Sequence, residues 1–466
     1  MKQDPVGERI SLLLDEHSFR EILSGVENIG AEARKAGDGV SAGFGRIGGR
    51  DVAVYCHDPS FQGGSIGEVG ARKIAKLYKA AVKYGVPIIA LSDSSGARIH
   101  EGPSSLIAVG ELFQAVADVS GIIPQITVVV GGCVGGAAFA AALGDLVVGC
   151  TGKGYIFING PRAVKQYTGE SITAMELGGV ETMAESSGMV DLLAPNEAEA
   201  IKLVKKLLTY LPSNRWEKPP TDPDPVKPIS NRIEDPPSLK NLLDVVFDGG
   251  SILEMQPLYA ANVFTGLARL EGIPVAVVAN QRQALIDIRA SNKIHRLVRL
   301  AGNFNLPLIT FVDAPSFTPG KVEEQSGLVR EGSKIFKSYI EARVPKISVI
   351  LGKAYGGAYI AMCSKGLGAD YVIGLPGAEV AVLPPEIAAE FIYRRELDGL
   401  SSGEREKVLQ QYTEGLRRHS SGEALLAFGV VDRFVEPEML RPTLTDVVKL
   451  FYHRYFGSKP SRPHKP

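Results

Sequence analysis

The sequence predicts an α/β protein built from two copies of one fold. Two runs of mostly β-branched residues, 126–130 and 347–351, each lead into a glycine-rich turn that opens an Ala-rich segment. A short apolar run bounded by such a turn is typical of a buried strand that leads into a helix. The segments around these turns also recur in the same order in both halves of the chain, at offsets of about 220 to 241 residues. Conserved order at similar offsets indicates an internal duplication.

Three pairs of segments carry the duplication. The first pair has a Gly-x-x-Arg start and a Val-Ala-Val end, the second is an apolar strand that ends in aspartate, and the third is a short Gly-x-Val-Asp motif. The pairs are 43–54 with 266–277, 86–93 with 306–313, and 188–191 with 429–432.

The elements of the first half follow from local pattern. Residues 6–23 carry apolar positions at helical spacing and predict a short amphipathic helix. Residues 41–58 predict two paired strands, because Gly48 and Gly49 interrupt an otherwise strand-like run. Residues 74–84 then predict a helix, and residues 86–91 a buried strand. That strand ends at the polar residues 92–98, where functional loops of α/β proteins commonly lie.

A proline-rich segment divides the chain. Residues 211–237 contain repeated prolines that break both helical and strand periodicity. We therefore predict an N-terminal domain over 1–212, a linker over 213–237 and a C-terminal domain over 238–466.

Composition excludes several classes of protein. The 466 residues include 51 basic and 52 acidic side chains, so no net field favours nucleic acid as a partner. No apolar stretch is long enough for a membrane span, and the first residues do not form a signal sequence, which predicts a cytoplasmic enzyme. The four cysteines lack metal-ligand spacing, so we expect buried free thiols and no bound metal.

The two glycine-rich turns suggest chemistry. A strand that stops at Gly-Gly-Ala and enters a helix leaves backbone N–H groups without partners at the helix start. Such amides can stabilise an oxyanion. The turns at 131–138 and 352–359 therefore predict two oxyanion sites on the duplicated scaffold.

Many motifs, taken together and in order, resemble the carboxyltransferase (β) component of biotin-dependent acyl-CoA carboxylases, of the propionyl-CoA carboxylase β type. The resemblance covers nearly the whole chain after about Val6. In the first half the matching segments are 63–68, 93–102 and 155–161, and in the second half they are 279–281, 311–320, 344–346, 353–359 and 393–396.

This resemblance implies two crotonase-like (ClpP/crotonase) domains with a β-β-α spiral architecture, and a homo-oligomer that is usually a hexamer. The N-terminal domain of one subunit would hold acyl-CoA against the C-terminal domain of another, which receives carboxybiotin. Amides of Gly357 and Ala358 would stabilise the biotin ureido oxyanion as CO2 leaves. The biotin enolate would take the α-proton of the thioester, and amides of Gly135, Gly136 and Ala137 would hold the thioester enolate that attacks CO2.

Further site residues are carried over from the same family. On the acyl-CoA side, Lys73 and Lys76 are candidates for the phosphates of coenzyme A, the alternative being solvated surface lysines. The accompanying turns add Gly64, Ser95, Gly96 and Arg98, and Arg98 is either a coenzyme A contact or a structural ion-pair residue. On the biotin side the candidates are Tyr355, Gly356, Ser316 and Phe317. His100, His295 and Asp313 are interpreted as loop or packing residues, because this mechanism requires no side-chain base.

Some positions depart from the propionyl type. Serine at 95 and 316 replaces glycine, Glu331 replaces histidine, and Leu-Pro-Pro-Glu at 383–386 replaces a Met-Gly sequence. Ile360 stands where propionyl-type enzymes tend to have aspartate, at a position associated with acyl specificity. An aliphatic residue there resembles acetyl-CoA or broader-range members, and the following residues resemble methylmalonyl-CoA decarboxylase α subunits and the transcarboxylase.

Biotin itself must come from another protein. No Ala-Met-Lys-Met biotinylation sequence and no ATP-grasp region occurs in the chain, which implies a separate biotin carboxyl carrier protein and a separate biotin carboxylase. The predicted substrate is a short acyl-CoA in the acetyl to butyryl range. Alternative interpretations are a decarboxylase or transcarboxylase subunit, a biotin-independent crotonase-fold decarboxylase or hydrolase, and a non-catalytic scaffold subunit.

Overall fold

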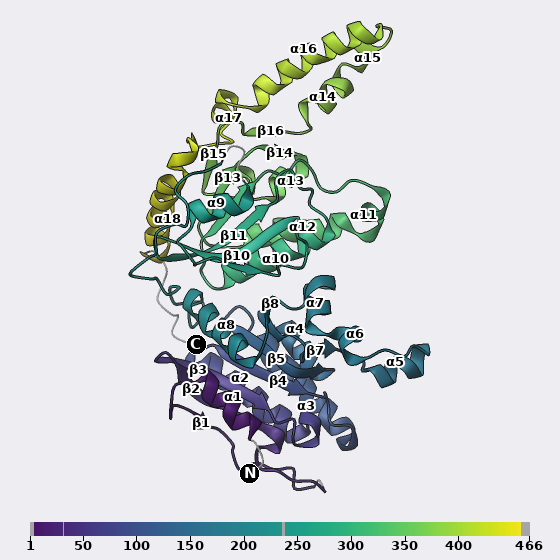
Figure 1. Cartoon of the computed structure of the whole chain (residues 1–466), viewed down its shortest axis with the longest axis vertical. Helices are drawn as coiled ribbons and strands as arrows, with labels where there is room; N and C mark the ends of the chain where they lie inside the picture. The colour runs from purple at the N-terminus through teal and green to yellow at the C-terminus, as the bar shows by residue number, and fades with distance from the viewer. Residues whose placement is uncertain (1–3, 31, 235–237, 458–466) are drawn as a thin grey trace. The chain divides into compact units, whose positions relative to one another are not determined.

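The computed structural model describes residues 4–30, 32–234 and 238–457, and these form two compact units (Figure 1). Unit 1 ends at Pro219 and unit 2 begins at Pro220, inside the segment predicted to be a linker. Each part of that segment is bound to its own unit. The side chain of Asn214 donates to the carbonyl of Gly85 at 2.9 Å, and the amide of Asp222 donates to a carbonyl of unit 2. Residues 235–237 of the predicted linker lie outside the described residues.

Unit 1 is built on a mixed sheet in the order β1-β2-β3-β4-β5-β6-β8, with β7 paired to β5. Strands β2 (Val40–Ile47) and β3 (Arg50–His57) form the predicted hairpin. Its turn needs glycine, because Gly48 and Gly49 have φ of 57° and 78°. From β3 onward the neighbours on the main path are parallel.

The first helix is shorter than the sequence pattern predicts. Helix α1 runs only over Pro5–Leu13, and the next element is the short strand β1 (Arg20–Glu21). The chain leaves the helix at this point because the carboxylate of Asp15 accepts the amides of Gly48 and Gly49, both at 2.8 Å. An acceptor for two hairpin amides competes with helix continuation.

Helix α2 (Glu68–Tyr84) packs its apolar face into the core of unit 1, together with side chains of the sheet and of α3 (Pro103–Asp118). It begins six residues before the predicted start. The other helices and strands of unit 1 are η1 (Ala36–Gly39), η2 (Gln62–Gly64), β4 (Ile88–Ser94), η3 (Ile99–Glu101), β5 (Gln125–Val134), α4 (Gly136–Leu143), β6 (Leu146–Cys150), β7 (Tyr155–Phe157), α5 (Pro161–Thr168), α6 (Ala174–Gly178), α7 (Val180–Ser186), β8 (Leu192–Ala194) and α8 (Glu197–Tyr210).

Unit 2 repeats this plan. Strands β10 (Val263–Leu270) and β11 (Ile273–Asn280) form the antiparallel hairpin, and the sheet order is β17-β15-β13-β12-β11-β10-β9. Its other elements are α9 (Leu239–Val246), β9 (Leu253–Met255), α10 (Ile288–Asn303), β12 (Leu308–Val312), α11 (Lys321–Ser326), α12 (Leu328–Glu341), β13 (Lys346–Ile350), β14 (Lys353–Tyr355), α13 (Gly356–Ala361), η4 (Lys365–Leu367), β15 (Tyr371–Gly374), β16 (Glu379–Ala381), α14 (Pro385–Ile392), α15 (Arg394–Leu397), α16 (Ser402–Ser420), α17 (Glu423–Ala427), β17 (Arg433–Phe434), η5 (Pro437–Met439) and α18 (Leu440–Gly457).

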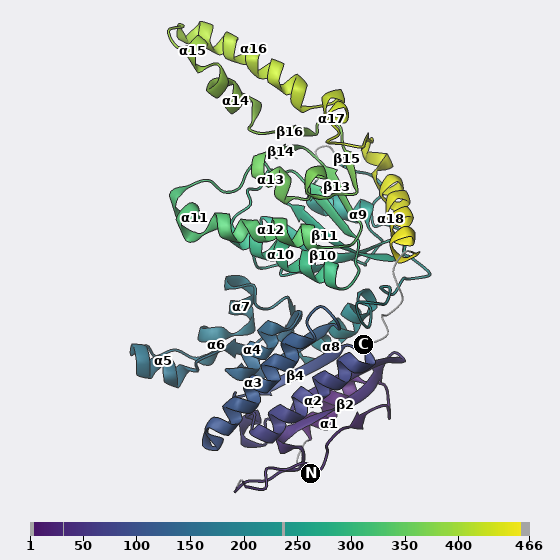
Figure 2. The same ribbon diagram turned by 180° about the vertical axis from the view of Figure 1, so that it is seen from behind.

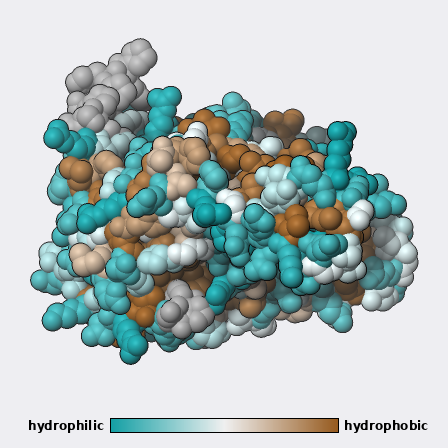
Figure 3. All heavy atoms as spheres, turned by 90° about the horizontal axis from the view of Figure 1, so that it is seen from above, coloured by the Kyte–Doolittle hydropathy of each residue, from teal (hydrophilic) through white to brown (hydrophobic). Residues whose placement is uncertain are grey.

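Unit 2 adds a helical hairpin, which Figures 1 and 2 show extending from its sheet as α14, α15 and α16. The rings of Tyr393 and Tyr412 stack at 3.6 Å between centroids and join its two arms. Large apolar side chains on the hairpin and just before it are exposed, among them Val382, which precedes α14, and Phe391 on α14. In the view from above, exposed apolar side chains lie among hydrophilic ones (Figure 3).

The cysteine prediction is confirmed, since Cys56, Cys133, Cys150 and Cys363 are all free and buried. Within the part of the chain that the structure describes, no helix is long and apolar enough to cross a membrane. Over the same residues, no cluster of three or more His, Cys, Asp or Glu side chains could hold a metal ion.

Candidate functional site

The glycine turn of unit 1 lies between β5 and α4. Gly135 precedes the helix with φ 54° and ψ −112°, a conformation that only glycine adopts readily. Its own N–H donates to the carbonyl of Phe157 at 3.0 Å. Gly135 is therefore not available as an oxyanion donor, which corrects the prediction for this residue.

The amides of the next two residues, Gly136 and Ala137, are open in the sense that they have no acceptor within the helix. The first helical hydrogen bond of α4 runs from Phe139 N–H to the carbonyl of Gly135 at 3.1 Å. The amides of Gly136 and Ala137 belong to the first turn, which has no intrahelical acceptors. Two of the three residues predicted to hold an oxyanion in unit 1 thus remain candidate donors.

A further amide, not identified from the sequence, faces this turn. Ile66 forms a parallel bridge with Ala97, in which Ile66 N–H donates to Gly96 and Arg98 N–H donates to Ile66. In such a bridge the backbone groups of Ala97 point to the opposite side of the strand. That side is the segment that follows β5, which is the glycine turn, because Ser94 of the same segment pairs in parallel with Cys133 of β5. The Ala97 N–H therefore faces the open amides of α4.

Unit 2 has the same arrangement. Gly356, with φ 53°, begins α13, so the amides of Gly357 and Ala358 lie in the helix's first turn. Ile286 forms the matching bridge with Phe317, which leaves the Phe317 N–H on the side of this turn. The ring of Phe317 packs directly against the turn, 3.5 Å from an ideal Cβ on Gly357.

The biotin-side candidates from the sequence all lie around this turn. The carbonyl of Ser316 accepts the amide of Ile286 at 3.1 Å and so fixes the loop that carries Phe317. Tyr355 directly precedes the turn, and its buried hydroxyl donates to Glu379 at 2.8 Å. Ile360 lies on α13 with 44% of its surface exposed.

Three acyl-CoA-side candidates shape the loops near the unit 1 turn. An ideal Cβ on Gly64 would lie 2.0 Å from the carbonyl oxygen of Asp93, so no side chain fits there. Gly96 has φ 95° and packs against the end of β5. Ser95 is exposed, and its amide donates to the carbonyl of Gly63 at 3.1 Å. Close backbone approach therefore accounts for both glycines.

The structure does not support Lys73 as a direct ligand of coenzyme A. Its side chain is 0% exposed, and its ammonium binds Glu21 and the carbonyl of Val40, each at 2.8 Å. The matching lysine of unit 2, Lys293, is also buried and donates to backbone carbonyls of Tyr259 and neighbouring residues. A lysine that caps strand carbonyls in both units has a structural role.

Arg98 forms structural ion pairs, which is one of the two roles expected for it. Its guanidinium is 1% exposed and lies 2.6 Å from Asp38 and 2.7 Å from Glu101. It also donates to the carbonyl of Ser65 at 3.0 Å. These bonds fix the loop that carries the Ala97 amide. Of the basic candidates only Lys76, exposed on α2, is free to meet a phosphate from solvent.

An aspartate holds each glycine turn in place; Asp93 is partly buried and Asp313 is buried. Asp93 accepts the amide of Gly132 at 3.1 Å, and Asp313 accepts the amide of Lys353 at 2.9 Å. An ideal Cβ on Gly131 would lie 2.1 Å from the Asp93 carboxylate, which explains the glycine there. Asp313, interpreted from the sequence as a loop or packing residue, thus supports the turn.

Titratable side chains near the turns are poor acid-base groups. Burial raises the pKa of the Cys133 thiol to about 12, so it is a neutral thiol. Burial also lowers the pKa of His57 to about 4, which keeps this imidazole uncharged. Neither side chain is therefore suited to proton transfer at the unit 1 turn near neutral pH.

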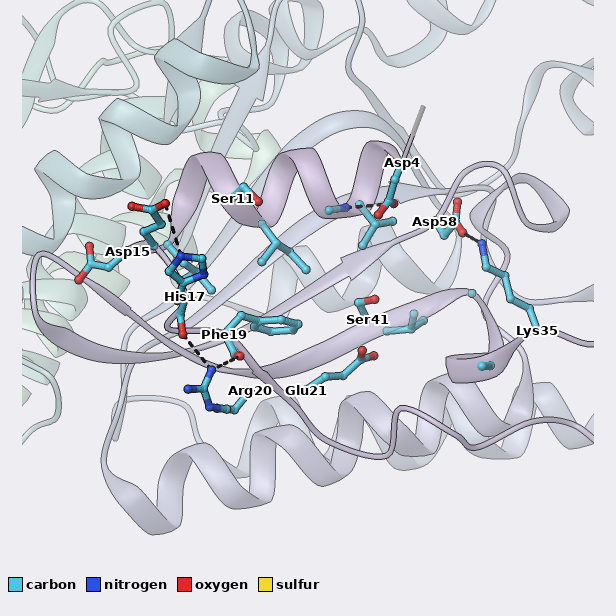
Figure 4. A pocket seen from close by; sticks show the side chains of 18 residues that line it. Asp4, Ser11, Asp15, His17, Phe19, Arg20, Glu21, Lys35, Ser41 and Asp58 are labelled. Atoms are coloured by element: carbon cyan, nitrogen blue, oxygen red, sulfur yellow. Dashed lines mark hydrogen bonds and ion pairs between the residues drawn. The ribbon is translucent and has the colours of Figure 1, made fainter. Parts of the chain in front are cut away.

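The cavity of about 1090 Å³ in unit 1 lies elsewhere, beside α1, β1 and β2 (Figure 4). None of the predicted site residues lines it. Its charged groups are bonded within the protein: Lys35 pairs with Asp58, Glu21 pairs with Lys73, and Asp15 accepts hairpin amides. It is separate from the glycine turns.

The chain is similar over nearly its whole length to known proteins. The carboxyl transferase domain family matches residues 3–465. The methylmalonyl-CoA decarboxylase subunit alpha of Veillonella parvula is 37% identical, over 98% of this chain and 91% of its own length. The propionyl-CoA carboxylase beta chain of Roseobacter denitrificans is 39% identical, over 93% of this chain and 88% of its own. The structure of transcarboxylase 12S, with methylmalonyl-coenzyme A and methylmalonic acid bound, superposes with a TM-score of 0.89 at 36% identity, covering 99% of this chain and 91% of that one.

Proposed function

The chain belongs to the carboxyl transferase family and is a carboxyltransferase enzyme of the propionyl-CoA carboxylase β type, and from that premise we propose how its two glycine turns share the reaction. One observation carries the proposal. Each unit pairs the open amides of a helix start with an inward amide from the neighbouring loop, at Ala97 in unit 1 and at Phe317 in unit 2. Two such amide sets fit two oxygens that gain negative charge during one reaction.

In unit 1 the amides of Gly136, Ala137 and Ala97 hold the thioester oxygen of a short acyl-CoA. They stabilise the enolate that forms when the α-carbon loses its proton. Each well-placed donor contributes about 3 kcal/mol of transition-state stabilisation in sites of this kind. Arg98 and Asp93 act indirectly, because they fix the loop and the strand end that carry these amides.

In unit 2 the amides of Gly357, Ala358 and Phe317 hold a ureido oxygen. Biotin on a separate carrier protein supplies the CO2 and the base that removes the α-proton. The neutral Cys133 and His57 of unit 1 fit this scheme, since neither offers a side-chain base. The ring of Phe317 and the exposed side chain of Ile360 offer apolar surface beside the turn.

Lys76 is the candidate contact for the phosphates of coenzyme A. It lies on the exposed face of α2, among Arg72, Lys79 and Lys83 at helical spacing. Arg72 already pairs with Glu68 and with Glu111. A lysine in this position acts as a point charge for a phosphate.

A second candidate function is removal of carboxylate onto biotin, as in a methylmalonyl-CoA decarboxylase or transcarboxylase. Two observations favour it: the 37% identity to the Veillonella subunit, and the aliphatic Ile360 on α13. The same two amide sets serve both directions, because the enolates are the same.

We further propose a hexamer served by separate biotin carboxylase and biotin carboxyl carrier proteins. The support is the similarity to transcarboxylase 12S, whose structure is described as a hexamer assembly. The mass of the assembly in solution tests this directly.

The experiment that tests the function uses the purified full chain with malonyl-, methylmalonyl- and ethylmalonyl-CoA, with and without free biotin. Biotin-dependent loss of carboxylate supports the carboxyltransferase mechanism, and the preferred thioester identifies the acyl group. Equal loss without biotin contradicts it and indicates a biotin-independent crotonase-fold decarboxylase. No loss from any of the three contradicts the proposed substrate class.

A further inference from the structure

The turn of unit 2 has a wall formed by residues 379–386. Strand β16 pairs in parallel with β14, with Lys353 opposite Glu379 and Tyr355 opposite Ala381. Beyond the strand, the carbonyl oxygen of Val382 lies 3.0 Å from an ideal Cβ on Gly356. The wall therefore touches the first glycine of the turn, and its position limits where that turn can lie.

One side chain holds both ends of this wall. Arg417, on α16, has its Nε 3.4 Å from Glu379 at the start of the wall. Its terminal nitrogen pairs with Glu386 at the end of the wall, in the first turn of α14. The flat guanidinium of arginine has several donors in a fixed fork and can bind two carboxylates at once, whereas a lysine ammonium is a single point charge.

The wall is connected to the turn by a buried hydrogen bond. Glu379 is 8% exposed and accepts the Tyr355 hydroxyl at 2.8 Å on its other oxygen. Tyr355 is itself 3% exposed and directly precedes Gly356 in the chain. The chain of contacts therefore runs from α16 through Arg417, Glu379 and Tyr355 to the residues that carry the open amides.

Unit 1 holds its corresponding wall differently. Strand β7 pairs with the end of β5, and the carbonyl oxygen of Ile158 lies 3.8 Å from an ideal Cβ on Gly135. This corresponding segment, residues 155–158, contains no charged side chain, and the rings of its Tyr155 and Phe157 stack at 5.3 Å. The arginine contact is specific to the unit 2 turn.

We propose that Arg417 is a positioning residue for the biotin side of the reaction. It fixes the wall 379–386 and, through Glu379 and Tyr355, the turn that carries Gly357 and Ala358. This inference rests on the proposed function, because it assumes that biotin reacts at the unit 2 turn. It makes no contribution to the binding of acyl-CoA at unit 1.

The test measures biotin-dependent loss of carboxylate from methylmalonyl-CoA by the full chain, with free biotin and thioester varied independently. Arg417→Ala is expected to lower kcat/KM for biotin at least tenfold and to leave KM for the thioester within twofold. Arg417→Lys, which keeps the charge, is expected to recover part of the loss. Arg418→Ala is the matched control, since Arg418 is the next residue of α16 and exposed, and it is expected to change neither constant.

Two milder variants keep the test decisive if Arg417→Ala does not fold. Glu386→Gln removes one of the two carboxylates, and Tyr355→Phe removes only the hydroxyl, so each is expected to lower kcat/KM for biotin severalfold. Circular dichroism measures the folded fraction of each variant, and rates are expressed per folded chain.

Three results would overturn the inference. They are a kcat/KM for biotin within twofold of wild type in Arg417→Ala or in both milder variants, an equal loss in Arg418→Ala, and a parallel rise in KM for the thioester. Absence of biotin dependence in the wild-type chain would instead overturn the proposed function, and the inference with it. The wild-type measurement therefore separates the two failures.

Discussion

The aspartates beneath the two glycine turns have the same geometry and different surroundings. In each unit one carboxylate oxygen accepts an amide of the chain just before the turn, at 3.1 Å from Asp93 and at 2.9 Å from Asp313. The second oxygen of Asp93 lies 2.9 Å from Arg9, whereas that of Asp313 accepts the amide of Gln283 at 3.3 Å. The duplicated turn thus requires an acceptor at this position and does not require an ion pair.

The difference connects unit 1 to its first helix. Arg9 is 5% exposed on α1 and also lies 2.9 Å from Glu197 on α8. Asp93, Arg9 and Glu197 form a partly buried network that joins the unit 1 turn to two helices. Among the described residues no cation forms an ion pair with Asp313, and burial raises the pKa of its carboxyl above the ordinary 3.8.

The largest effects are expected at the first glycines of the turns. Gly135→Ala and Gly356→Ala each place a Cβ on a residue with φ near 54°, which strains the backbone by about 1–3 kcal/mol and displaces the neighbouring amides. Biotin-dependent activity is expected to fall about 100-fold or more in each, because a lost oxyanion donor costs on the order of 100-fold.

The two variants also distinguish the turns. Gly356→Ala should be the worse one, because its Cβ meets the Val382 carbonyl at 3.0 Å, against 3.8 Å to Ile158 for Gly135. Gly110→Ala, on an exposed position of α3 with nothing within 4 Å, is the control and should keep full activity. Activity near wild type in either turn variant would contradict the assignment of that turn.

The aspartate comparison is tested by stability. Asp93→Asn keeps an acceptor for Gly132 and loses the ion pair to a buried arginine, so the free energy of unfolding should fall by about 1–3 kcal/mol. Asp313→Asn removes no ion pair, so the free energy of unfolding of this variant should fall by less than about 1 kcal/mol. Denaturant unfolding of both variants measures the difference. Equal losses would mean that Arg9 contributes nothing through Asp93.

Much of the fold was predictable because it follows local pattern. The hairpin at 41–58, the buried cysteines and the duplication all depend on residue spacing, and the structure confirms them. The end of α1 was not predictable, since it depends on Asp15 reaching the distant Gly48 and Gly49. The Ala97 and Phe317 amides were missed for a similar reason: a backbone donor has no side-chain signature, and its direction is set by a bridge to another segment.

For Lys73, on the acyl-CoA side, the sequence contained a signal that this lysine is buried. Lys73 lies four residues before Leu77 on the apolar face of α2, whereas Lys76 lies on the charged face. In the sequence repeat Lys73 also corresponds to Lys293, so a lysine occupies the same position in both units. Arg98 gave no such signal, because its partners Asp38 and Glu101 meet it only in the folded loop.

The duplicated lysines give a pH-dependent prediction. Burial lowers the pKa of Lys293 from 10.5 to about 8. Between these values the unfolded chain binds more protons than the folded one, so the stability of wild type should rise as pH increases from about 8 to 10.5. Lys293→Met should lose this rise. Denaturant unfolding at several pH values measures this rise in stability. The same rise in the variant would contradict its assignment to Lys293.

The smallest effect is expected at Lys76. Lys76→Ala should raise KM for an acyl-CoA about twofold to fivefold, because a single exposed contact between opposite charges is worth about 1 kcal/mol or less. KM for the same acyl group on N-acetylcysteamine, which lacks the nucleotide, should not change. Lys240→Ala, an exposed lysine of unit 2, is the control. An equal rise for both thioesters would show that Lys76 does not recognise the phosphates.

The division of labour between the turns is tested most directly by one pair of variants at Gly357. Gly357→Pro removes the amide hydrogen within the first turn of α13, where proline fits a helix, while Gly357→Ala keeps it with a Cβ at an ordinary 3.5 Å from Phe317. The measurement is kcat for biotin-dependent loss of carboxylate together with the dissociation constant for acyl-CoA. We predict a fall in kcat of about 100-fold or more in Gly357→Pro alone, with acyl-CoA affinity unchanged in both variants. Equal activity of the two variants, or a matching loss of acyl-CoA affinity in Gly357→Pro, would contradict the account.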